Sequence, residues 1–147
     1  MELPAVSDPD LVTVSLRFPH AVICLISALT YHHLTTQIPH EISLAVSPHA
    51  RLPVFASPPV HAYRFSEAAF AVGIETSDLD YVPIRVYDPE KTLADCFKFR
   101  NRLGMDVVQE ALKLYKSRMP VKPDALLRYA RICRIEHVMT PYLEAML

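Results

Sequence analysis

The order of apolar and polar positions predicts two helices at the start of the chain. Residues 7–10 are typical of a helix start, in which Asp8 caps the helix and Pro9 takes the first helical position. We expect this helix to end near Pro19. Residues 20–34 are almost all apolar, and the run exceeds the usual length of a strand, so it favours a buried central helix.

Short strand patterns follow, over residues 41–46, 61–65, 73–76 and 81–87. The four prolines between 47 and 59 predict a loop, and residues 66–72 fit a short helical turn. Residues 77–80 separate the last two strand patterns, which predicts a hairpin. Pro83 cannot donate a ladder hydrogen bond, so we expect it at an edge or at a position without such a bond.

The clearest helix start in the chain is at Asp88. Its carboxylate can accept hydrogen bonds from the first free amides of a helix, and Pro89 lacks the amide that would otherwise have no partner. Glu90 complements the positive end of the helix. We expect this helix to reach about Arg102 and to be closed by Gly104 in the left-handed conformation.

Helical spacing continues to the end of the sequence. Apolar residues over 107–115 predict a second helix that Pro120 ends, Pro123 begins a third, and a fourth starts near Ile135, where Pro141 can bend or restart it. Helices, strands and then helices follow one another in separate groups. This order predicts an α+β fold, with a small, mainly antiparallel sheet packed with the N-terminal helices and with a C-terminal cluster of three to four helices.

Composition adds a charge asymmetry to this picture. The 147 residues fit one domain, 51% of them are hydrophobic, and the formal net charge is only −1. Residues 1–97 carry five Lys and Arg against eleven Asp and Glu, whereas residues 98–134 carry ten against three. The imbalance indicates an acidic partner. On charge alone, the candidate interaction surface is Lys98, Arg102, Lys113, Lys116, Arg128, Arg131 and Arg134.

Several classes of site fit the sequence poorly. Two glycines cannot build a phosphate-binding loop or a dinucleotide fingerprint, and the longest apolar run, residues 21–29, is too short to cross a bilayer. The three cysteines are widely spaced in apolar contexts, which favours buried free thiols in a reducing, cytoplasmic compartment. Ser27 lies in an apolar run without the glycines of a nucleophile elbow, so we expect it to serve close helix packing.

Histidines and acidic residues leave two weaker alternatives open. His40-Glu41 begins like a zinc-protease motif, but Leu44 stands where the second histidine is required, and a weak metal site built from His33, His49 and His61 stays open. Asp88, Glu90 and Lys91 allow a metal-dependent nuclease, although helix capping explains the two carboxylates. We therefore expect no catalytic residue, no metal and no cofactor.

Four segments together resemble the AbiEi family of antitoxins, which regulate transcription in type IV toxin–antitoxin systems of viral defence. They are residues 18–29, 41–46, 84–97 and 126–133. The block Arg85-Val-Tyr-Asp-Pro-Glu-Lys-Thr92, followed by Asp95-Cys96, is the most specific in combination with the first.

The resemblance implies a non-enzymatic antitoxin or transcriptional-regulator domain over residues 1–147. Family members usually begin with a winged helix-turn-helix, so the chain corresponds to the C-terminal domain alone. The partner that the family implies is an AbiEii-type nucleotidyltransferase toxin. Promoter DNA would be a partner only if a winged helix-turn-helix is supplied elsewhere, and no membrane is implied. A nucleic-acid-binding module that uses the basic helices of residues 98–134 is the alternative.

Overall fold

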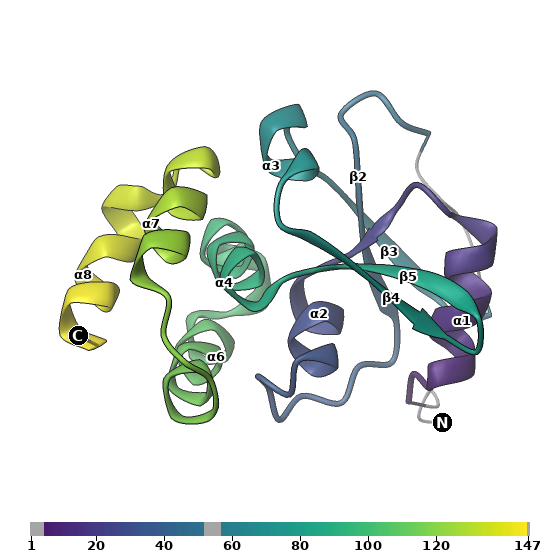
Figure 1. Ribbon diagram of the computed structural model, residues 1–147, viewed down its shortest axis with the longest axis horizontal. Helices are drawn as coiled ribbons and strands as arrows, with labels where there is room; N and C mark the ends of the chain where they lie inside the picture. The colour runs from purple at the N-terminus through teal and green to yellow at the C-terminus, as the bar shows by residue number, and fades with distance from the viewer. Residues whose placement is uncertain (1–4, 52–56, 147) are drawn as a thin grey trace.

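A mixed five-stranded sheet forms one part of the molecule and a group of helices the other (Figure 1). The computed structural model describes residues 5–51 and 57–146. Its strands are β1 (Val22–Ile23), β2 (Ile42–Val46), β3 (Val60–Arg64), β4 (Ile74–Leu79) and β5 (Val82–Tyr87). Its helices are α1 (Asp8–Arg17), α2 (Leu25–Tyr31), α3 (Glu67–Ala71), α4 (Pro89–Lys98), α5 (Arg100–Leu103), α6 (Met105–Arg118), α7 (Pro123–Ile132) and α8 (Glu136–Met146).

The strand order is β3-β2-β1-β5-β4, which confirms the α+β class. The pairs β1–β2 and β4–β5 are antiparallel, whereas β1–β5 and β2–β3 are parallel. The sheet is therefore mixed rather than mainly antiparallel. Sequence patterns identify strands but not their partners, and the long connection from β2 to β3 allows the chain to return and enter β3 in the same direction.

Each face of the sheet is covered by a different core cluster. Successive side chains of a strand point to opposite faces, so Val22 packs with one cluster and Ile23 with the other. Val14 of α1 belongs to the second cluster, with Ile84 and other inward residues of the sheet. The first cluster joins the opposite face to α2, α4, α6, α7 and α8. Helix α4 lies between the sheet and the C-terminal helices (Figure 1).

The single helix expected over residues 20–34 is wrong. Val22 and Ile23 form β1, the central strand, and after Cys24 the chain enters α2 directly, with Leu25 at a positive φ of 50°. Both β1 residues are at most 1% exposed because the strand is covered on both faces. Full burial removes the alternation that distinguishes a strand from a buried helix.

The predicted helix starts are confirmed at α4 and shifted by one residue at α1. The Asp88 Oδ1 accepts a hydrogen bond of 2.7 Å from the Lys91 amide, and Pro89 is the first helical residue. At α1 the N-cap is Ser7 rather than Asp8. The Ser7 amide and hydroxyl donate to the Asp10 carboxylate, which holds the start of the helix one residue earlier.

The helix expected to run to Arg102 breaks at Phe99, and the short α5 follows. Gly104 has a positive φ of 93°, as expected, but its ψ of 135° lies outside the left-handed helical region, so it serves as a corner into α6. The second and third C-terminal helices are confirmed. The fourth runs through Pro141 without a restart.

The other strand predictions agree with the structure to within one residue at each end, except that β4 runs three residues beyond its predicted end. The hairpin is present, but its two-residue turn is Asp80-Tyr81, both at positive φ, so residues 77–79 belong to β4. Pro83 lies at the end of β5 that β1 does not reach. Residues 66–72 contain α3 as expected. Residues 52–56 of the predicted loop lie outside the described residues, and within the described part no helix has the length and apolar character needed to cross a membrane.

Candidate functional site

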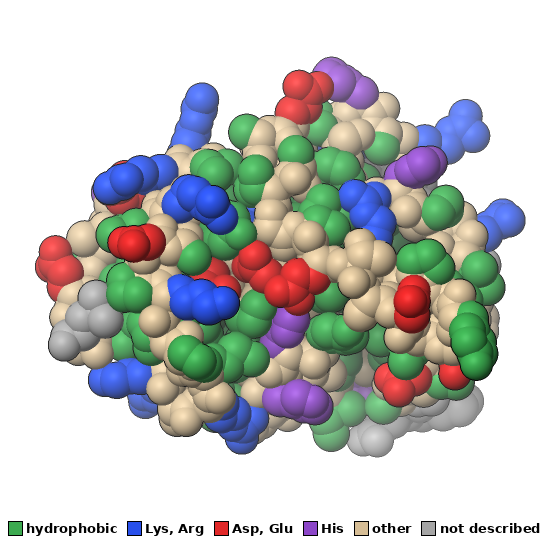
Figure 2. Space-filling model, viewed as in Figure 1, with side chains coloured by type: hydrophobic (Ala, Val, Ile, Leu, Met, Phe, Trp, Pro, Cys, Tyr) green, Lys and Arg blue, Asp and Glu red, His purple; other side chains and the backbone are tan. Residues whose placement is uncertain are grey.

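All seven residues of the predicted interaction surface are exposed in the structure. Leu126, Tyr129, Ala130 and Cys133 are buried on the inner side of α7, so its arginines lie on the outer side, as helical spacing predicts. Figure 2 shows Lys and Arg side chains gathered over the end of the molecule formed by α4 to α8, with acidic side chains among them. Exposure alone does not make these residues one site.

The structure brings four of the seven near one cavity. Lys98 and Arg134 line it directly, although they are 36 positions apart in the sequence. Arg131 lies beside Arg134 along a neighbouring hollow and forms a 3.2 Å salt bridge with Glu136. The Arg102 guanidinium lies 5.7 Å from the ring centre of Phe99, which also lines the cavity.

The other three residues line neither the cavity nor the neighbouring hollow. Lys113 and Lys116 project from α6 and do not line the cavity. Arg128 lies over the ring of Tyr129 at 4.9 Å and donates a 3.2 Å hydrogen bond to its hydroxyl group. The predicted surface therefore divides into a cavity group (Lys98, Arg102, Arg131 and Arg134) and three cations outside it, of which two lie on α6 and one on α7.

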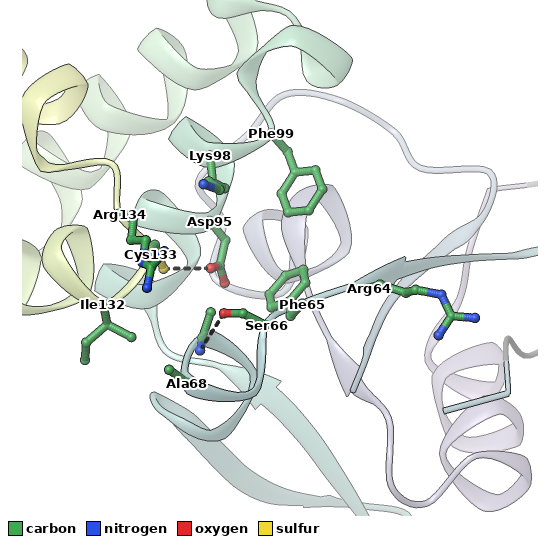
Figure 3. A pocket seen from close by; sticks show the side chains of 11 residues that line it. Arg64, Phe65, Ser66, Ala68, Asp95, Lys98, Phe99, Ile132, Cys133 and Arg134 are labelled. Carbon is green, nitrogen blue, oxygen red and sulfur yellow. Dashed lines mark hydrogen bonds between the residues drawn. The ribbon is translucent and has the colours of Figure 1, made fainter. Parts of the chain in front are cut away.

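The cavity has a volume of about 380 Å³ and lies between the start of α3, the second half of α4 and the end of α7 (Figure 3). Phe65 and Phe99 form an aromatic wall, with their ring centres 5.5 Å apart and their planes 23° from parallel. Asp95 and Cys133 lie next to each other in it, and the Cys133 thiol is 3.5 Å from the Asp95 carboxylate. The remaining lining residues are Arg64, Ser66, Ala68, Ala69, Lys98, Ile132 and Arg134.

A buried ion pair lies behind this cavity. Lys91 and Asp95 occupy positions i and i+4 of α4, and the Lys91 Nζ is 2.8 Å from both carboxylate oxygens. Lys91 is 0% exposed and Asp95 2%. The ammonium also lies 3.9 Å from the ring centre of Tyr87 and 5.0 Å from that of Phe65, so aromatic faces replace part of its lost hydration.

Two tyrosines bind the carboxylates that had suggested a nuclease. The Tyr129 hydroxyl donates to Asp88 Oδ2 at 2.7 Å, while the other Asp88 oxygen caps α4. The Tyr115 hydroxyl donates to Glu90 Oε2 at 2.7 Å and accepts from the Lys122 amide at 2.9 Å. These contacts tie the start of α4 to α6 and α7, which gives both carboxylates a role in holding the helices together.

Burial changes the proton affinities in this region. It raises the pKa of Asp95 to about 6, although the Lys91 ammonium acts in the opposite direction. Burial, reinforced by the Asp95 charge, raises the pKa of the Cys133 thiol to about 12. The pKa of the Tyr129 hydroxyl also rises to about 12, through burial and its hydrogen bond to Asp88. At neutral pH the thiol therefore stays protonated and is a poor nucleophile.

The histidines are dispersed. His33, His49 and His61 are all exposed, and His61 lies 3.7 Å from Glu41 and stacks on Tyr63. His32 instead contacts the Tyr87 carbonyl oxygen at 2.7 Å. Among the described residues, no three His, Cys, Asp or Glu side chains form a group that could hold a metal ion.

The expectation of buried free thiols is confirmed, whereas Ser27 contacts a strand rather than a neighbouring helix. Cys24, Cys96 and Cys133 are buried free thiols. The Ser27 hydroxyl oxygen accepts a 2.8 Å hydrogen bond from the Ser43 amide, so this serine joins α2 to β2.

No model of a known protein family matches this chain, and no curated protein matches it either.

Two features of this region are absent from the sequence analysis. The Lys91–Asp95 pair has a recognisable signal, because opposite charges at i and i+4 lie on the same face of a helix. The cavity has no such signal. Its walls come from three segments that only the tertiary fold brings together, and Phe65 and Ser66 have no distinctive spacing.

Proposed function

We propose that this chain is a non-enzymatic antitoxin or transcriptional-regulator domain that acts by binding a partner protein. The observation that supports the proposal is the exposure of all seven predicted Lys and Arg residues, four of which, Lys98, Arg102, Arg131 and Arg134, lie around one cavity. The partner we propose is a nucleotidyltransferase toxin of the AbiEii type, and the AbiEi-like segments support that choice. The block from Arg85 to Cys96 supplies the end of β5 and most of the buried part of α4, so it would define the scaffold rather than the binding surface.

Charge would act here at two distances. The excess of Lys and Arg in residues 98–134 attracts an acidic partner over several ångströms and increases its association rate. At contact, Lys98 and Arg102 would form direct ion pairs. Neither forms a salt bridge with another described residue, so both are available to a partner.

Co-expression with the product of the adjacent open reading frame tests the proposal. We expect that product to be a nucleotidyltransferase whose toxicity this chain relieves and which co-purifies with it. A neighbouring product of another class, or toxicity that the chain does not relieve, would contradict the proposal.

Charge reversal then locates the surface. We expect Lys98→Glu with Arg102→Glu to weaken toxin binding, and Lys113→Glu with Lys116→Glu to show whether α6 belongs to the interface. Arg17→Glu with Arg51→Glu is the matched control, because both side chains are exposed and lie outside the predicted surface. An equal loss in the control would mean that net charge, not a defined surface, drives binding.

A nucleic-acid-binding module is the second candidate, and the ten Lys and Arg against three Asp and Glu in residues 98–134 support it. Phosphate contacts would make such binding fall steeply with salt. Absence of DNA or RNA binding at low salt would remove this candidate while leaving the first one standing.

A further inference from the structure

We propose that the cavity between α3, α4 and the end of α7 binds a small organic anion that carries an aromatic ring, such as an aryl phosphate or aryl carboxylate. The cavity places two cations beside an aromatic wall (Figure 3). This site goes beyond the proposed function and does not depend on it, because it requires no protein partner.

The charge of the cavity selects an anion. Lys98 and Arg134 line it, and neither forms a salt bridge with another described residue. The carboxylate of Asp95 also faces it, but both of its oxygens lie 2.8 Å from the Lys91 ammonium, so its charge is balanced. Arg64 contributes little, because its guanidinium donates to the Pro48 and Ala50 carbonyls and points away from the cavity (Figure 3).

The backbone at Arg134 allows its cation to be tested apart from its role in folding. The Ile135 amide donates to the Ala130 carbonyl and the Arg134 amide to the Arg131 carbonyl, which is a Schellman end to α7. Arg134 occupies the left-handed position of that motif, with a φ of 57°. Glycine is favoured there because a Cβ atom costs energy, so replacing Arg134 with glycine removes the cation and relieves the backbone at the same time.

The walls select a flat, apolar body for the ligand. Phe65 and Phe99 present roughly parallel rings, and Ala68, Ala69 and Ile132 complete an apolar lining. A volume of about 380 Å³ lies near the lower end of the range for small-molecule sites. One ring and one anionic group fit this space, with the ring beside Phe65 and Phe99 and the anion near Lys98 and Arg134.

The test titrates the intact protein with phenyl phosphate, inorganic phosphate and phenol, and follows the phenylalanine ring signals by NMR. We expect phenyl phosphate to bind about tenfold more tightly than inorganic phosphate, because only it also fills the aromatic part of the cavity. We expect phenol to bind more weakly than phenyl phosphate. Equal affinities for phenyl phosphate and inorganic phosphate would overturn the proposal.

Arg134→Gly separates a role in binding from a role in folding. We expect it to weaken phenyl phosphate about tenfold, through loss of a charge-assisted contact, while raising the urea midpoint, through relief of the left-handed backbone. Lys122→Ala is the control, since this exposed lysine does not line the cavity. Unchanged affinity in Arg134→Gly, or an equal loss in Lys122→Ala, would overturn the site.

Discussion

Replacing Lys91 with methionine removes the ammonium that balances Asp95 inside α4. Both oxygens of Asp95 are 2.8 Å from the Lys91 Nζ, and both residues are at most 2% exposed. After the substitution, the Cys133 thiol at 3.5 Å would be the remaining hydrogen-bond donor to that carboxylate among the described residues. A buried carboxylate would then lack a compensating charge.

The expected cost of Lys91→Met is about 3–5 kcal/mol, the usual penalty for breaking a buried pair by removing one partner. A domain of this size has a free energy of unfolding of about 5–15 kcal/mol, so the variant would lose a large part of it. Replacing both partners, as Lys91→Met with Asp95→Leu, leaves no buried charge. The double variant should therefore lie close to the original protein in stability, and the coupling between the two substitutions should be about 3 kcal/mol or more.

Urea unfolding of the original protein, Lys91→Met, Asp95→Leu and the double variant measures this coupling free energy directly. Lys98→Met on the same helix is the matched control, because Lys98 is exposed and should change stability by less than about 0.5 kcal/mol. The reasoning would be refuted if Lys91→Met cost less than about 1 kcal/mol. It would also be refuted if the double variant lost the sum of the two single losses.

The same variant has a pH dependence of known sign. The pKa of Asp95 is about 6 in the folded protein, against an ordinary value of 3.8, so the fold favours the protonated carboxyl group. The stabilisation that this protonation provides is complete below about pH 4 and is lost as the pH rises through 6. Removing Lys91 removes an interaction that lowers this pKa, and raises it further. The cost of Lys91→Met should therefore be smaller at pH 5 than at pH 8, and a cost that grows on acidification would contradict this account.

Three further outcomes are expected. Gly73→Ala should destabilise the protein by more than about 1–2 kcal/mol in urea unfolding, because its φ is +77° and a Cβ atom would lie 2.6 Å from the Lys91 Cβ. Gly104→Ala should also destabilise the protein, because its φ of +93° is strained for any residue with a Cβ atom, although that Cβ would meet only the movable carboxylate of Asp106; a substitution without loss at either glycine would contradict this geometry. Tyr129→Phe should cost about 1 kcal/mol by removing a donor to Asp88, with no loss expected if that bond is absent in solution. In the native protein, a thiol reagent at pH 8 should label none of the three cysteines, because burial raises the pKa of each and blocks access, whereas in urea it should label Cys24, Cys96 and Cys133.

Signals that act within one turn of the chain predicted the start of α4 correctly and the start of α1 to within one residue. The cap at Asp88 depends only on a carboxylate and an amide three residues later, so residue type and spacing predict it. The outward arginines of α7 follow from helical periodicity in the same way. By contrast, residues 20–34 carry no periodicity, because both sides of β1 and most of α2 are buried.

Non-local features could not be predicted in this way. The parallel pairing of β1 with β5 joins residues more than 60 positions apart, and no local pattern specifies it. The cavity depends on the same long-range packing, since Phe65, Asp95 and Arg134 reach it from separate segments. The excess of positive charge in the sequence identified Lys98 and Arg134 as candidate surface residues. Only the fold shows that both line the same cavity.

The brevity of β1 has a consequence for how the sheet opens. The two residues of β1 join the β2–β3 pair to the β4–β5 hairpin. Between β1 and β5, only Ile23 and Val86 are paired. Side-chain packing above and below the sheet, more than backbone hydrogen bonds, must then hold the two pairs together. We expect amide hydrogen exchange to resolve them as two cooperative units, each protected by its own internal ladder.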